Sequence, residues 1–179
     1  MKLNGQALQK PLVHAFVLPR SDGSSLTFQL QPLPLGFHQR LRGRGIQPPV
    51  PPSKVARDAA GRPLRDAAGQ AVTIADSQHP EYVAELERYH QRVAVLALAE
   101  SLNADPAIAF DTPSPTAASA APEWARFADA LFDELEQSGF TAGDLILFCQ
   151  EICRISNLLD DHLAAAQANF SLPPPSGST

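Results

Sequence analysis

The segment Ser138-Gly139-Phe140-Thr141-Ala142-Gly143-Asp144 marks the boundary between two predicted helices. Thr141 and Asp144 have the form of a capping box, in which a hydroxyl and a carboxylate accept hydrogen bonds from the free backbone N–H groups at a helix start. Ser138 and Gly139 are a short break that allows two helices to fold back on each other. These features predict an antiparallel helix pair joined at this turn.

Apolar side chains recur at helical spacing on both sides of the turn, over 122–137 and 142–168. Residues at steps of three and four lie on one face of a helix, so each segment is predicted to be amphipathic. The two faces are expected to pack together, with Trp124 as a core anchor. They consist of Trp124, Phe127, Leu131 and Leu135 in the first helix, and Leu145, Phe148, Ile152, Ile155, Leu159 and Leu163 in the second.

A third helix is predicted over 80–102. Pro80 suits the first turn of a helix, and the segment 93–99 is almost wholly apolar, so this helix is expected to be the most buried one. The linker 103–121 is rich in Pro, Ser and Ala. The resulting division of the chain has a helical core over 79–170 and a disordered tail over 171–179.

Residues 1–46 are predicted to form a β-hairpin and a short helix. The segments 12–18 and 26–31 have strand composition, and the turn between them contains Asp22-Gly23, which tolerates positive φ. The second strand alternates apolar and polar residues, so Leu26, Phe28 and Leu30 are expected on a buried face that packs on the helices. The short helix is predicted over 35–41.

Residues 47–78 read as a Pro-rich linker and an extended arm. The prolines of 48–52 favour polyproline II, and Arg-Asp-Ala-Ala-Gly then occurs twice, in 57–64 and in 65–72, with turns expected at Gly61 and Gly69. The arm either becomes ordered on a partner or is an inert insertion. Its candidate contact residues are Leu64, Val72 and Ile74, apolar side chains for which a solvated loop has little use.

The fold class expected from these elements is α+β and mainly α-helical, with the N-terminal hairpin packed on a small helical bundle and a Pro-rich extended arm. A chain of 179 residues is long enough for one domain with tails. Its net charge of −5 provides no general attraction for nucleic acid. No apolar run approaches the length of a membrane span, and no signal peptide is recognised, so a soluble cytoplasmic protein without membrane contact is expected.

No catalytic constellation is recognised in the sequence. Cys149, Cys153 and His162 match no common zinc pattern, and the glycine-rich phosphate loops and nucleophile motifs of enzymes are missing. We therefore expect no catalytic residue, no metal, no cofactor and no enzymatic activity.

Two stretches together resemble the tail assembly chaperones of tailed bacteriophages, of the siphophage type. The first runs from the hairpin at 18–33 through the Pro-rich arm to the helix at 76–102. The second, 124–159, is similar to the closing helices of such proteins, where a Gly-Phe-Thr turn separates a Glu-rich helix from a Leu/Ile-rich one. The excursion at 48–76 is longer than in the shortest members.

The resemblance implies a non-catalytic chaperone that binds the tape-measure protein and helps to recruit tail-tube subunits. Such a protein acts in the host cell cytoplasm and is absent from the mature virion. Homo-oligomer formation and a frameshifted, extended form are left open by the sequence. The client groove is expected along two helices, bordered by Tyr82, Leu86, Tyr89, Phe127, Leu131 and Phe132, with the monomer core as the alternative role for each of these residues.

Two other functions are compatible with the sequence. A structural connector or minor tail protein retained in the virion would use the arm to clasp its neighbours. A small enzyme with an unrecognised site is the other.

Overall fold

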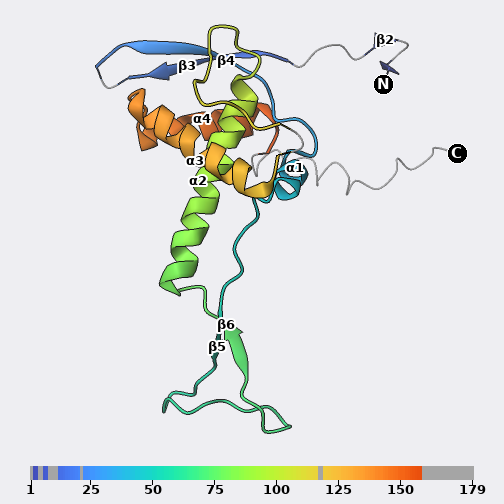
Figure 1. Cartoon of the computed structure of the whole chain (residues 1–179), viewed down its shortest axis with the longest axis vertical. Helices are drawn as coiled ribbons and strands as arrows, with labels where there is room; N and C mark the ends of the chain where they lie inside the picture. The colour runs from blue at the N-terminus through green and yellow to red at the C-terminus, as the bar shows by residue number, and fades with distance from the viewer. Residues whose placement is uncertain (1, 4–5, 8–11, 21, 117–118, 159–179) are drawn as a thin grey trace, which may run out of the picture.

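The computed structural model describes residues 2–3, 6–7, 12–20, 22–116 and 119–158. The fold is α+β and mainly helical, with a β-hairpin over a group of helices and an arm that projects from the opposite end (Figure 1). The strands are β1 Lys2–Leu3, β2 Gln6–Ala7, β3 His14–Pro19, β4 Ser25–Leu30, β5 Ser53–Val55 and β6 Thr73–Ala75. The helices are α1 Phe37–Gly43, α2 Pro80–Leu102, α3 Ala121–Gln137 and α4 Ala142–Ile155.

The predicted hairpin consists of β3 and β4, which pair antiparallel with Phe16 opposite Phe28. Its turn has Gly23 at φ 82°, and the Asp22 carboxylate accepts a hydrogen bond from the backbone N–H of Ser24. Leu30 is buried, as the alternating pattern predicts. Leu26 is 42% exposed, contrary to the prediction, because it lies next to the turn at the end of the sheet.

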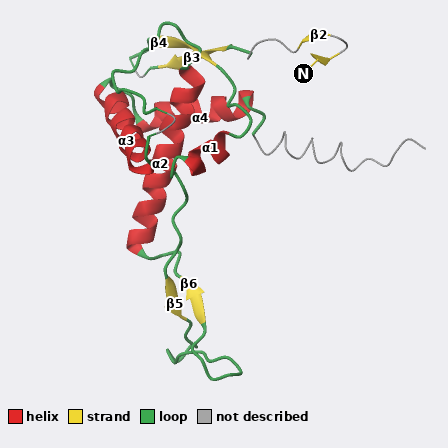
Figure 2. Ribbon diagram, turned by 45° about the vertical axis from the view of Figure 1, so that its right-hand side comes forward, coloured by secondary structure: helices red, strands yellow, loops and turns green. Residues whose placement is uncertain are grey.

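The hairpin packs on the helices through its inner face (Figure 2). α4 lies under β3, and α2 lies under β4. Phe148 of α4 is fully buried, and its ring meets those of Phe16 and Phe28 edge-on, at centroid distances of 5.0 and 4.9 Å. This aromatic contact supplies the partner surface that an isolated two-stranded hairpin needs for stability.

Helix α2 connects the arm to the body of the molecule (Figure 1). Its fully buried residues all lie in its C-terminal part, from Val95 to Leu102, so only this part has the central position predicted for the whole helix. Arg92 forms a two-pronged ion pair with Asp129 of α3, at 2.7 and 2.6 Å. The ion pair lies just before the point where α2 becomes buried, and it fixes the position of α3 there.

Two helices have bounds in the structure that differ from those predicted from the sequence. The short helix α1 begins at Phe37, after Gly36 at φ 80°, two residues later than expected. α4 ends at Ile155, where a helix to residue 168 was expected, because Asn157 has φ 55° and therefore cannot continue a right-handed helix. Leu159, Leu163 and the tail at 171–179 lie outside the described residues.

The arm is an ordered hairpin. β5 pairs with β6, and three residues spaced eight apart form a ring of backbone hydrogen bonds: Ala56 N–H to Val72 O, Leu64 N–H to Ala56 O, and Val72 N–H to Leu64 O. Gly61 and Gly69 have φ 77° and 79°, which confirms the turns expected in the two repeats. The backbone N–H and C=O groups of Ala56, Leu64 and Val72 are thus hydrogen-bonded within the arm itself, without a partner protein.

Candidate protein-binding surface

Phe140 is held in place by the end of α3 and the start of α4. The Phe140 N–H bonds to Leu135 O and the Gly139 N–H bonds to Glu136 O, the two hydrogen bonds of a Schellman motif. The capping box at Thr141 and Asp144 follows, as the sequence predicts. The Phe140 ring is therefore fixed between two helix ends and lies near Phe28 and Phe148.

Arg20, from the hairpin turn, ties the sheet to this junction. Its Nη2 donates to Gly139 O at 2.6 Å, and its Nη1 donates to Asp144 Oδ2 at 2.9 Å. The guanidinium also lies 5.7 Å from the centre of the Phe140 ring, within reach of a cation–π interaction. The position of Phe140 thus depends on residues of both the hairpin and the helices.

Two apolar cavities, each of about 330 Å³, lie beside Phe140 and share Leu135 and Phe140 in their walls. The first lies against α3 and α4, with Phe132, Leu145 and Ile146. The second lies between the hairpin and the loop after α2, and includes Leu26, Phe28, Ile108 and Phe110. We call the two cavities together the Phe140 groove.

Carboxylates line the Phe140 groove together with its apolar residues. Glu136 lines the first cavity, and Glu134 lines the second. Glu134 accepts hydrogen bonds from the N–H groups of Asp111 and Thr112. Burial raises the pKa of Glu134, but hydrogen bonding by the Thr112 side chain and by the two backbone N–H groups outweighs it and holds the pKa below its usual value. The groove therefore combines apolar walls with negative charge.

The residues of α3 predicted for the client groove have separate locations. Phe132 lines the Phe140 groove. Leu131 is fully buried in the core, so it borders no open surface. Phe127 lines another cavity, together with Trp124 and Arg44, whose guanidinium lies 3.8 Å from the centre of the Trp124 ring. Trp124 is buried, as predicted for a core anchor.

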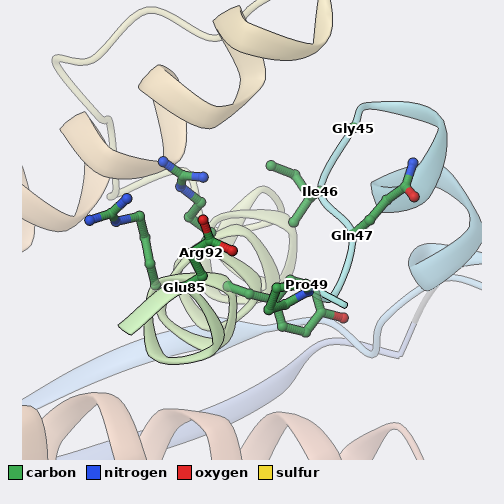
Figure 3. Close-up of a pocket in the computed structure, with 8 residues that line it drawn as sticks. Gly45, Ile46, Gln47, Pro49, Glu85 and Arg92 are labelled. Carbon is green, nitrogen blue, oxygen red and sulfur yellow. The ribbon is translucent and has the colours of Figure 1, made fainter. Parts of the chain in front are cut away.

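The residues of α2 predicted for the groove lie on another side. Tyr89 lines a polar cavity of about 260 Å³ between α2 and the loop after α1, with Ile46, Gln47 and Glu85 (Figure 3). Tyr82 and Leu86 are half-buried on the part of α2 nearer to the arm. The structure therefore does not bring the six predicted residues together around one groove.

The three apolar candidates of the arm are accessible to different degrees. Leu64 and Ile74 are exposed, whereas Val72 is half-buried beside the ring of backbone hydrogen bonds. They lie at the end of the molecule farthest from the β3–β4 hairpin (Figure 2). An arm-bound partner and a groove-bound partner would thus occupy opposite ends of the protein.

The sequence prediction missed Phe140, Leu135 and Ile146 as groove residues. Leu135 lies on the helix face that the sequence predicts to be buried, and Phe140 lies in the turn between α3 and α4. The direct packing expected between these two helices is not found in the described part of the chain, because α3 and α4 each pack mainly on α2. The sequence did not show where on the helices the hairpin packs. β4 and the loop carrying Phe110 form one wall of the second cavity, so the groove could not be recognised from the helices alone.

Among the described residues, no group of three or more His, Cys, Asp or Glu side chains is placed to hold a metal ion. Cys149 and Cys153 are free thiols, and burial raises the pKa of Cys149, with a smaller contribution from Cys153. None of the described helices combines the length and the apolar character needed to cross a membrane. Comparisons of the chain with models of known protein families, with curated proteins and with solved structures find no match.

Proposed function

We propose that this protein is a non-catalytic assembly chaperone of a tailed bacteriophage, which binds the tape-measure protein and helps to recruit tail-tube subunits in the host cytoplasm. The observation that carries the proposal is the Phe140 groove, an open apolar surface on the body of the molecule. The resemblance of the hairpin, the arm and the closing helices to tail assembly chaperones supports it.

The groove suits an amphipathic helical client. Helix-binding proteins take up apolar side chains spaced three and four residues apart in a hydrophobic groove, and the two adjoining cavities offer two such positions. Glu134 and Glu136 favour basic residues beside the apolar stripe of the client. Covering that stripe would keep a long helical protein from aggregating before assembly.

The test uses a matched pair of neighbouring residues on α4. Ile146 lines the groove and is 57% exposed, whereas Leu147 is 38% exposed and lies outside the groove lining. The tape-measure protein encoded by the same phage would be co-expressed with wild type, Ile146→Asp or Leu147→Asp. We expect Ile146→Asp to lower the soluble, co-purifying fraction of the tape-measure protein at least tenfold, and Leu147→Asp to leave it unchanged.

Mass spectrometry of soluble assembly intermediates and of mature particles provides the second readout. A chaperone is found with the tape-measure protein in the soluble fraction and is missing from mature particles. A fixed copy number in mature particles would refute the chaperone role.

A fixed copy number in mature particles would instead support a structural connector or minor tail protein. The observation that favours this alternative is the ordered arm, which exposes Leu64 and Ile74 far from the body. Leu64→Asp would then reduce incorporation into particles, while Ile146→Asp would not.

A further inference from the structure

The two outer edges of the β3–β4 hairpin differ in what covers them. On the β4 side, the Gln29 N–H donates to Asp105 Oδ2 at 2.7 Å, and the Gln31 N–H donates to Ser101 O at 2.9 Å. Ser101 lies at the end of α2, and Asp105 in the loop that follows it. The chain itself therefore covers this edge from Gln29 to Gln31.

The β3 edge has no such cover among the described residues, because β3 pairs with β4 alone. Ala15 is opposite Gln29, and Val17 is opposite Thr27. Because Gln29 donates away from the hairpin, this register places the backbone N–H and C=O groups of Ala15 and Val17 on the outer side of β3. They form a row of hydrogen-bonding groups that a further strand can use.

This edge also lacks the usual protection against pairing. Soluble proteins block open edges with charged side chains, bulges or proline. From residue 12 to 18 the sequence has no Lys, Arg, Asp or Glu, and Pro19 comes only at the end of the strand. The side chains beside the edge are apolar and exposed: Leu12 is 82% exposed and Val17 is 56% exposed.

The helix that lies under β3 is α4. Glu151 of α4 contacts His14 of β3 at 2.8 Å, so its side of the helix faces this strand. Leu147 is one turn before Glu151 on the same side and is exposed. Below the strand edge, this side of α4 therefore carries the exposed Leu147 beside the polar cluster of His14, Glu151 and Arg154.

We propose that the outer edge of β3 pairs antiparallel with β3 of a second copy of this chain, about a twofold axis at Ala15. In this register Val13 lies opposite Val17 of the second copy, and Leu12 lies opposite Leu18. The residues with outward backbone groups, Val13, Ala15 and Val17, then bond to one another across the axis. The two hairpins become one four-stranded sheet with α4 of each copy beneath the join.

A second copy is the occupant because the edge is complementary to itself. Small Ala15 sits on the axis between valines on either side, so the same patch fits its own twofold image without steric overlap. The residues along the edge carry no like charges that the axis would bring together. His14, Glu151 and Arg154 lie below the edge and already pair among themselves.

Lysine substitutions at one cross-strand pair test the proposal. Val17 and Thr27 face each other in the hairpin and are both exposed. Val17→Lys therefore places a charge on the β3 edge proposed for pairing, and Thr27→Lys places the same charge on the neighbouring strand β4. Sedimentation equilibrium of the full chain is expected to show a dimer for wild type and for Thr27→Lys. Val17→Lys is expected to weaken dimerisation by at least tenfold, with an unchanged near-ultraviolet circular dichroism spectrum.

A backbone variant isolates the hydrogen bonds. Val17→Pro removes an outward N–H that the hairpin does not use, so it is expected to give a folded monomer; if it fails to fold, Val17→Lys decides the test. A wild-type chain that is monomeric at every concentration, or a Val17→Lys variant that dimerises normally, overturns the proposal. Ile146→Asp is expected to remain dimeric, so loss of client binding and loss of the dimer are separate results.

Discussion

Arg20 Nη1 lies 2.9 Å from Asp144 Oδ2, although the two residues are 124 positions apart in the chain. This ion pair joins the hairpin turn to the first turn of α4. The same carboxylate accepts hydrogen bonds from the backbone N–H and the hydroxyl of Thr141. One side chain thus caps a helix, anchors the sheet and supports the turn that holds Phe140.

Replacing Asp144 with Ala should destabilise the whole domain. The substitution removes half of the capping box and leaves Arg20 without its carboxylate partner, a loss of about 2 kcal/mol in the free energy of unfolding. Urea unfolding followed by circular dichroism measures it. Asp133→Ala, at an exposed position of α3, is the control and should cost under about 0.5 kcal/mol. Equal losses in the two variants would contradict the anchoring role.

Stability should also fall in acid because of the same carboxyl group. The backbone hydrogen bond from Thr141 is the main cause that holds the pKa of Asp144 below its usual value of 3.8, and burial opposes it; the Thr141 hydroxyl and Arg20 add to the lowering. Because the folded-state pKa is depressed, the stabilisation is present above pH 3.8 and is lost as the pH falls through the folded-state pKa. In the Asp144→Asn variant, the melting temperature should fall less steeply with decreasing pH below about pH 4. An unchanged slope would show that other carboxyl groups dominate acid unfolding.

Gly45 should be far less replaceable than Gly23, although both have positive φ, 79° and 82°. A Cβ at Gly45 would overlap the Cβ of Ala121 at the start of α3, whereas a Cβ at Gly23 meets nothing within 4 Å. Gly23→Ala should cost about 1 kcal/mol through backbone strain alone. Gly45→Ala should cost at least about 1 kcal/mol more, because α3 must shift. Thermal unfolding of both variants checks this, and similar melting temperatures would argue against close packing of the α1–α3 junction.

Each turn of the arm should be stabilised by the aspartate of its own repeat and not by that of the other repeat. The Asp58 carboxylate accepts hydrogen bonds from the N–H groups of Ala60 and Arg62, and Asp66 does the same for Ala68 and Gln70. Asp58→Ala should therefore speed amide hydrogen exchange at Ala60 and Arg62. Exchange at Ala68 and Gln70 serves as the internal control and should be unchanged, as should the melting temperature. Exchange that is equally fast in wild type would contradict an ordered arm.

Much of the fold could be predicted where the deciding interactions lie within a few residues. The capping box at Thr141, the turn at Gly23 and the repeated turns at Gly61 and Gly69 all formed as the sequence indicated. The end of α4 was placed too late because the apolar period continues past Ile155, while the left-handed conformation of Asn157 interrupts the helix.

The candidate site was less predictable, because helical periodicity identifies an apolar face without identifying what covers it. Leu131 and Phe132 are adjacent in α3, yet the first is buried in the core and the second lines the Phe140 groove. The side of α3 that stays open depends on where α2 and α4 pack.

The sequence by itself determined the turns, the starts of the three longer helices, the hairpin and the mainly helical composition, since these depend on backbone preferences and on hydrogen bonds between near neighbours. Only the tertiary structure decided that the hairpin turn meets α4 through Arg20 and that Phe140 lies between two apolar cavities. It also decided that the chain covers the β4 edge at Gln29, whereas no other described strand pairs with the β3 edge. Those features join segments as much as 124 residues apart. No local pattern encodes such contacts, because they depend on how the assembled elements share one core.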